Sequence, residues 1–230
     1  MHELLTSEPF LLTLILGSYL TGVYLYTRSR MALLHPVIIS IGIIVGVLKW
    51  AGIDYGTFYD GSYIIRFMLG PSVVALGYVL YEQAEHLKGK VLSIMTSVTV
   101  GSFVGIASVI FVCRMMNVEQ VVIVSLESKS VTTPIALSLS ERSGGILSLT
   151  AITVVLCGIL GSIMGPFILK MLRVKSRVAT GLALGSASHG IGTARAIELG
   201  AVEGAISGLA IGLMGIMTSL MIPLMEKCFL

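Results

Sequence analysis

Two polar stretches stand out in an otherwise apolar chain, and their side chains could hold a small anion. The first is KSVTTPIALSL, 129–139, and the second is HGIGTARAIEL, 189–199. Lysine and arginine can neutralise a carboxylate, while serine and threonine hydroxyls can donate hydrogen bonds to its oxygens. The candidate substrate-binding residues are Ser128, Lys129, Ser130, Thr132, Thr133, Ser188, His189, Gly190, Thr193 and Arg195.

Each candidate also has a structural interpretation. Lys129 could extend its ammonium group to the outer membrane interface instead of meeting a substrate. Arg195 could hold a carboxylate with two parallel hydrogen bonds or could pair with Glu198 or Glu203. His189 could relay a proton, because its pKa lies near physiological pH, or could be a packing residue bonded to a backbone carbonyl. The hydroxyls could bond carbonyls one turn back in their own helices.

The elements that position these residues must be membrane helices. The chain has 230 residues, of which 55% are hydrophobic and 12% charged, and its mean hydropathy is +0.97. A soluble domain carries about 25% charged residues, so this composition predicts an integral membrane protein. The apolar runs are long and do not alternate, which favours helices over a barrel. The net charge of +3, without a basic stripe, gives no indication of nucleic acid binding.

Six ordinary spans are expected, each near the ~20 residues needed to cross about 30 Å of hydrocarbon. Lysine and arginine concentrate in the loops after the first, third and fifth spans, and these loops are therefore predicted to be cytoplasmic. The expected spans are Pro9–Tyr26, Leu34–Ala51, Ser62–Tyr81, Val91–Val112, Ile146–Met171 and Ala205–Met225.

This orientation decides the course of the two polar stretches. Residues 121–140 must begin and end outside, whereas residues 179–200 must begin and end inside. Both stretches are therefore predicted to be re-entrant segments, dipping into the membrane from opposite faces. Pro134, Gly190 and Gly192 are residues that interrupt a helix, and the freed N–H groups at the start of a half-helix favour an anion.

An internal repeat supports the same arrangement. Residues 125–150 align without gaps over 185–210, with Thr133 on Thr193 and Lys129 on His189. A hairpin followed by one span crosses the membrane an odd number of times, so its repeat must be inverted. Inverted repeats with broken helices are the architecture of secondary transporters.

The expected fold is thus an all-α integral membrane protein with about six transmembrane helices and two oppositely oriented re-entrant, broken-helix segments in an inverted repeat. We expect a single transmembrane domain over 1–230. It would contain N-terminal helices in 1–118 and repeat units in 119–172 and 179–230.

Other patterns exclude chemistry or indicate packing. The sequence has no HExxH, CxxC, phosphate-binding glycine loop or nucleophile–base set, so we expect neither an enzyme nor a cofactor or metal. The three cysteines, Cys113, Cys157 and Cys228, are interpreted as small buried hydrophobic residues. The pairs Gly101/Gly105, Gly181/Gly185 and Gly208/Gly212 predict close helix packing, and the glycine content is compatible with a homo-oligomer.

The stretches KSVTTPIAL and ASHGIGTARA, together with HPVIISIGI, LGPSVVALGYVLYEQ and GLALGSASHG, resemble the LrgB/CidB family over essentially the whole chain. The resemblance implies a multi-pass protein of the bacterial plasma (inner) membrane. Bacterial members are called antiholin-like, are linked to control of murein hydrolases, and are usually encoded beside a small LrgA/CidA-type membrane partner. Plant relatives move glycolate and glycerate, and some bacterial relatives are linked to pyruvate uptake. His35 departs from the asparagine that relatives often have.

Two functions follow from these observations. The first is a secondary transporter for small monocarboxylates, with the substrate bound between the tips of 125–137 and 185–197. The alternative is an antiholin-like regulator that modulates a holin-like partner without transporting anything itself. A channel is disfavoured because the sequence shows no repeated ring of pore-lining residues.

Overall fold

The computed structural model of the chain describes residues 5–29, 34, 36–68, 70–72, 74–75, 78, 81, 89 and 91–230. The regular structure in these ranges is helical, as the composition predicts. The chain divides into two compact units, Met1–Pro71 and Ser72–Leu230, and each is described by itself. The expectation of a single transmembrane domain stays a prediction.

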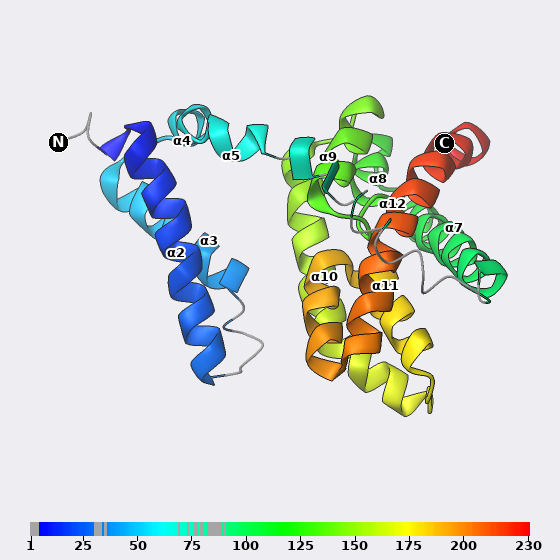
Figure 1. Cartoon of the computed structure of the whole chain (residues 1–230). Coiled ribbons are helices and arrows are strands. Elements are labelled where there is room, and N and C mark those ends of the chain that lie inside the picture. Colours follow the sequence, from blue (N-terminus) through cyan, green and yellow to red (C-terminus); the bar gives the residue numbers. More distant parts are fainter. Residues whose placement is uncertain are drawn as a thin grey trace. The chain divides into compact units, whose positions relative to one another are not determined.

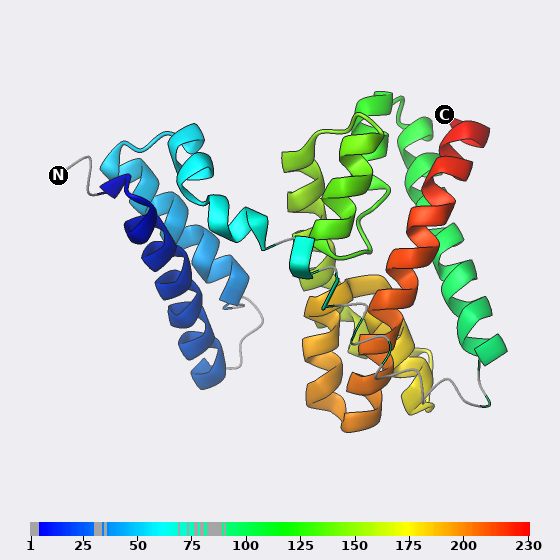
Figure 2. The same cartoon turned by 45° about the horizontal axis from the view of Figure 1, so that its top comes forward.

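The N-terminal unit is built on two antiparallel helices, α2 (Glu8–Ser29) and α3 (Pro36–Ala51), which lie side by side (Figures 1 and 2). The hydroxyls of Ser18 and Ser40 share a 2.8 Å hydrogen bond between them. Two short helices follow, α4 (Tyr55–Gly61), which makes an angle of 119° with α3, and α5 (Tyr63–Phe67).

The C-terminal unit contains three long helices, α7 (Val91–Met115), α10 (Leu147–Met171) and α12 (Ala201–Phe229). Helices α7 and α12 run parallel, side by side, as Figure 2 shows. The Ser102 and Thr218 hydroxyls share a 3.0 Å hydrogen bond halfway along them. Buried aliphatic side chains above and below this bond form the core between the two helices.

Four helices in the described part of the chain, α2, α7, α10 and α12, are long and apolar enough to cross a membrane, and the bent pair α3–α4 would make a fifth. These elements coincide with the first, second, fourth, fifth and sixth expected spans. The third expected span, Ser62–Tyr81, contains α5 and then runs into residues outside the described ranges. The expected number of six spans therefore stays a prediction.

The first polar stretch forms a hairpin. Its limbs are α8 (Gln120–Leu126) and α9 (Thr133–Arg142), joined by residues 127–132, and we call this segment the first hairpin. Near the turn, Ser128 Oγ donates to Ala136 O at 3.5 Å. Further from the turn, Thr150 Oγ1 of α10 contacts both Ser125 O, at 2.9 Å, and Ser140 Oγ, at 2.7 Å. The limbs are thus antiparallel, and the chain enters and leaves beside the start of α10.

The second polar stretch is also a hairpin, although it forms one continuous element, α11 (Arg177–Leu199). His189 has non-helical torsion angles there, φ 41° and ψ −133°. A Cβ on Gly192 would lie 2.4 Å from Leu184 O, whereas eight residues of straight helix span about 12 Å. The chain therefore folds back at His189, and residues 177–188 and 190–199 are the two limbs of the second hairpin.

The limbs of the second hairpin run in opposite directions along α12. A Cβ on Gly181 would meet the backbone of Glu203, and one on Gly185 would meet Ser207 four residues further on, so the first limb is parallel to α12. The second limb is antiparallel, because Thr193 Oγ1 hydrogen-bonds to Ser207 Oγ at 2.7 Å on its way back.

The first and second hairpins relate to the long helices that follow them in the same way. In both, the first limb is parallel to the next long helix and the second limb is antiparallel to it. Helix α10 is antiparallel to the first limb of α11, since Gly158 packs on His189 and Gly165 on Leu184. It is therefore antiparallel to α12 as well. In each half of this unit the hairpin packs on its long helix in the same way, but the two halves run in opposite directions. This arrangement is an inverted repeat.

Candidate functional site

The turns of the two hairpins meet halfway along α10. We call residues 129–132 the first tip and residues 187–190 the second tip. The Ser130 side chain and the Lys129 ammonium both lie close enough to the Cys157 thiol to interact with it electrostatically. From the other direction, Cys157 Sγ approaches Ala187 O at 3.6 Å. One side chain of α10 thus contacts both tips.

The depth of this meeting point follows from helix geometry. Cys157 lies ten residues after Leu147, the first residue of α10. At 1.5 Å per residue this is about 15 Å along the helix, half of the ~30 Å hydrocarbon thickness. The tips therefore converge near the middle of a span, where broken-helix transporters place their ligands.

Lys129 is half-buried, and its Nζ donates to Gly105 O of α7 at 3.2 Å. Gly105 lies near the middle of α7, so the ammonium group is held at depth and does not extend to a helix end. An ammonium group has three donors, and this bond uses one. None of the ion pairs found in the described ranges includes Lys129. The group can therefore give further hydrogen bonds and its charge to an anion.

His189 forms the break in α11 and fastens the second tip to α10. Its side chain is buried, and Nε2 lies 3.0 Å from Val154 O. Gly158 makes this approach possible, because a Cβ there would lie 2.7 Å from His189 Cε1. The imidazole therefore contacts a backbone carbonyl, as we expect if His189 is a packing residue.

Each tip also carries a buried hydroxyl that makes no hydrogen bond to any described residue. These are Thr132 Oγ1 in the first tip and Ser188 Oγ in the second, where Ser188 is fully buried against Gly161. Buried polar atoms almost always have a partner. Thr132 and Ser188 therefore each have a hydroxyl with spare hydrogen-bonding capacity at the meeting point of the tips.

The remaining candidate residues lie in or beside the backbone of the two tips. Thr132 is the N-cap of α9 but makes no side-chain capping bond, so the first N–H groups of α9, beginning at Thr133, lie at the first tip. Gly190 starts the second limb, and a Cβ there would meet nothing within 4 Å. Ser128 and Thr193 are used inside the fold, in the bonds to Ala136 O and to Ser207 Oγ.

Arg195 is placed differently from the other charged candidates. It lies six residues beyond the break, on the second limb, and pairs with Glu198 one turn further along. Its side chain is 42% exposed. Glu203 pairs instead with Arg177, at 3.8 Å. The structure thus brings Lys129 and His189 to the meeting point and holds Arg195 in a local ion pair.

Three residues of this region were not among the candidates found by sequence reasoning. Cys157 was interpreted only as a small buried residue, and nothing in the sequence marks it as the contact between the tips. Glu127 is 2% exposed and precedes the first tip, with Glu226 of α12 beside it. A signal for Glu127 existed, because a glutamate two residues from a lysine in an apolar stretch is unusual.

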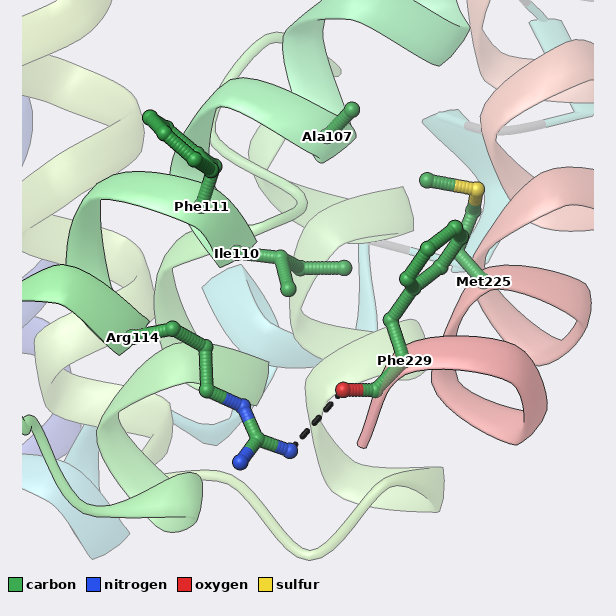
Figure 3. Close-up of a pocket in the computed structure, with 6 residues that line it drawn as sticks. All are labelled: Ala107, Ile110, Phe111, Arg114, Met225 and Phe229. Atoms are coloured by element: carbon green, nitrogen blue, oxygen red, sulfur yellow. Dashed lines mark hydrogen bonds between the residues drawn. The ribbon is translucent and has the colours of Figure 1, made fainter.

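A pocket of about 290 Å³ lies elsewhere, between the ends of α7 and α12 (Figure 3). Its lining is apolar apart from Arg114, whose Nη2 donates to Phe229 O at 2.8 Å and to Leu230 O at 3.3 Å. Because no other lining residue carries a hydroxyl or a second cation, this pocket offers a carboxylate fewer partners than the tips do. It is lined by Ala107, Ile110, Phe111, Arg114, Met225 and Phe229.

Comparison with known proteins assigns the chain to a family. The model of the LrgB-like family matches residues 15–228, nearly the whole chain. The chain belongs to the LrgB-like family. This confirms the resemblance seen in the sequence.

Three relatives of this LrgB-like protein each cover 95% of it. YxaC of Bacillus subtilis (strain 168) is 34% identical over 95% of both chains. The antiholin-like protein LrgB of the same organism is 31% identical, also over 95% of both. The antiholin-like protein LrgB of Bacillus cereus (strain B4264) is 32% identical over 95% of this chain and 96% of its own. No solved structure matches the chain.

Proposed function

We propose that this LrgB-like protein is a secondary transporter for small monocarboxylates of the glycolate, glycerate or pyruvate kind in the bacterial plasma membrane. One observation supports this proposal most strongly. Two hairpins that enter from opposite ends of α10 bring polar tips together at Cys157, halfway along the helix. Irregular backbone at that depth is tolerated where it lines a cavity or a binding site.

The tips supply the groups that a carboxylate requires. Lys129 gives a positive charge with spare donors, and Thr132 and Ser188 give hydroxyls that lack partners. The N-terminus of α9 adds partial positive charge at the first tip. Arg195 belongs to the proposed set as a second cation on the second limb. Alternating access would move the paired hairpins against the rest of the protein.

Uptake into proteoliposomes tests the proposal directly. The purified chain is reconstituted with and without an imposed pH gradient, and entry of radiolabelled glycolate, pyruvate and lactate is measured. We expect saturable uptake that Lys129→Ala abolishes and that Lys129→Arg retains in part. Lys170→Ala is the matched control, because Lys170 is exposed near the end of α10. If folded Lys129→Ala and Arg195→Ala both transport normally, the site is wrongly assigned.

A second function is favoured by the names of two relatives, the antiholin-like proteins LrgB. In this alternative the chain regulates a holin-like pore formed by an LrgA/CidA-type partner, and murein hydrolase activity follows from that regulation. The test is dye release from vesicles that contain the partner, with and without this chain. A change in release together with no uptake of any carboxylate would favour regulation over transport. The oligomeric state of the purified chain is measured in the same preparations.

A further inference from the structure

Outside the proposed substrate site, Glu127 is a buried carboxyl group with neither oxygen satisfied by a donor among the described residues. Glu127, the first residue after α8, is 2% exposed, and no N–H or O–H of the described residues reaches either of its oxygens. The Glu226 carboxyl of α12 lies within hydrogen-bonding and electrostatic range. Glu226 Oε1 is buried as well and has no donor.

The charged groups on the surrounding helices do not neutralise this pair. On α7, Arg114 is bonded to the C-terminal carbonyls, and Lys129 beyond the first hairpin's α8 is bonded to Gly105 O. On α9 and α12, Arg142 and Lys227 are exposed, as is Glu141. On α10, the nearest ionisable group is Cys157, at the tips. Among the described residues no third acidic, histidine or cysteine side chain joins the pair to make a metal site.

Two carboxylates without a cation cannot both be charged at low cost. Burying one ionised carboxylate without a partner is strongly unfavourable, and a second negative charge beside it adds repulsion. A single proton removes both penalties, because the protonated carboxyl can donate a hydrogen bond to the other. Like carboxylates in contact therefore share a proton and titrate as a pair.

We propose that Glu127 and Glu226 form a proton-binding site that binds one proton between them. The step is a protonation alone, in which a carboxylate and a proton give a carboxylic acid. Glu127 is two residues before Lys129 on the first hairpin, whereas Glu226 is on the last helix of the second repeat unit. Proton binding therefore holds the first hairpin against α12, and proton loss forces the two carboxylates apart.

The use of this site to couple proton movement to substrate movement rests on the proposed transport function. The site itself does not, and it can be measured without transport. Infrared difference spectroscopy on the full-length protein in lipid nanodiscs reports the carbonyl stretch of buried carboxylic acids. We expect a carboxylic acid band at neutral pH that Glu127→Gln removes. The matched control is Glu119→Gln, in the same segment but exposed, which keeps the band.

A second variant keeps the inference falsifiable if Glu127→Gln alters the fold. In Glu226→Gln the repulsion is gone and the new amide can donate to Glu127. We expect its band to disappear at a proton concentration about tenfold higher than in the unmodified protein. Absence of the band in the unmodified protein, its survival in Glu127→Gln, or its loss on adding sodium at constant pH would each overturn the proton site.

Transport measurements separate this inference from the proposed function. If the site couples proton movement to substrate movement, Glu127→Gln takes up substrate at a rate that no longer responds to an imposed pH gradient. Uptake by Glu119→Gln then still responds fully. Gradient-dependent uptake in Glu127→Gln overturns the coupling role and leaves the transporter proposal standing. A band that behaves as expected in a protein without uptake confirms the proton site and contradicts the proposed function.

Discussion

Replacing Gly181 by alanine tests how closely the first limb of the second hairpin lies on α12. A Cβ at this position would be 2.4 Å from Glu203 O and 3.0 Å from Glu203 Cα, both main-chain atoms. Neither can rotate away as a side chain would. Ordinary contact begins at 3.4 Å, so the limb must move away by 3.4 − 2.4 = 1.0 Å.

The magnitude of the expected destabilisation follows from two contributions. Overpacking of this kind costs about 1–3 kcal/mol, and a 1.0 Å displacement against main chain belongs near the upper value. Alanine regains about 1 kcal/mol of helix propensity over glycine, so the net loss is about 2 kcal/mol. Gly101→Ala is the matched control, because nothing lies within 4 Å of a Cβ there and only the favourable contribution of about 1 kcal/mol remains. The two variants should differ by about 3 kcal/mol.

Thermal unfolding in detergent measures the difference. For a chain of 150–250 residues each kcal/mol shifts Tm by roughly 2–4 °C, so the two variants should unfold about 6–12 °C apart, with Gly181→Ala lower. Equal Tm values would mean that the first limb does not run along α12 at backbone contact. The parallel course of that limb, and with it the inverted repeat, would then be refuted.

Three further predictions concern separate parts of the chain. Thr150→Val removes the hydroxyl that joins both limbs of the first hairpin to α10 and should cost about 1–3 kcal/mol by thermal unfolding, while Thr153→Val, whose hydroxyl bonds only within its own helix, should cost less. In a variant whose Cys113 and Cys228 are replaced, Cys157 should react with a maleimide more slowly when glycolate or pyruvate is present. Unchanged labelling in a protein that transports would contradict binding at the tips. A hydrogen bond from the Thr57 hydroxyl, and to a smaller extent bonds from two backbone N–H groups, hold the pKa of Asp54 below its usual value. Capping of α4 should therefore weaken as the pH falls through that lowered pKa. The protection factors of the α4 amides, taken relative to the intrinsic exchange rate at each pH, should fall on acidification in the unmodified protein and not in Asp54→Asn, where the cap is neutral.

The course of the two hairpins could be predicted from charge counting because orientation constrains every segment between two loops. Once three loops are assigned to one side, a segment that starts and ends on the same side has to return. The structure adds what counting cannot supply. It shows that one break uses residues 127–132, whereas the other uses His189 alone.

The candidate site could be predicted only in part, because residue type does not fix direction. Lys129 and Arg195 are both cations in polar stretches, yet one meets the carbonyl of Gly105 and the other pairs with Glu198. The same limit applies to glycine pairs of one pattern. Gly181 is in backbone contact with α12, while nothing approaches Gly101. Which face of a helix meets a neighbour depends on packing that the pattern does not contain.

The order of elements along the chain has a consequence for how the protein enters the membrane. Helices α8 and α9 have 7 and 10 residues, too few to span a bilayer, and α11 is not among the helices apolar enough to do so. In both repeat units the long helix that shelters the hairpin, α10 or α12, is synthesised after it. We expect each hairpin to stay at the insertion machinery until the following long helix has been synthesised, because unpaired backbone groups of the hairpin cannot face lipid. We therefore expect insertion to proceed by repeat units and not by single helices.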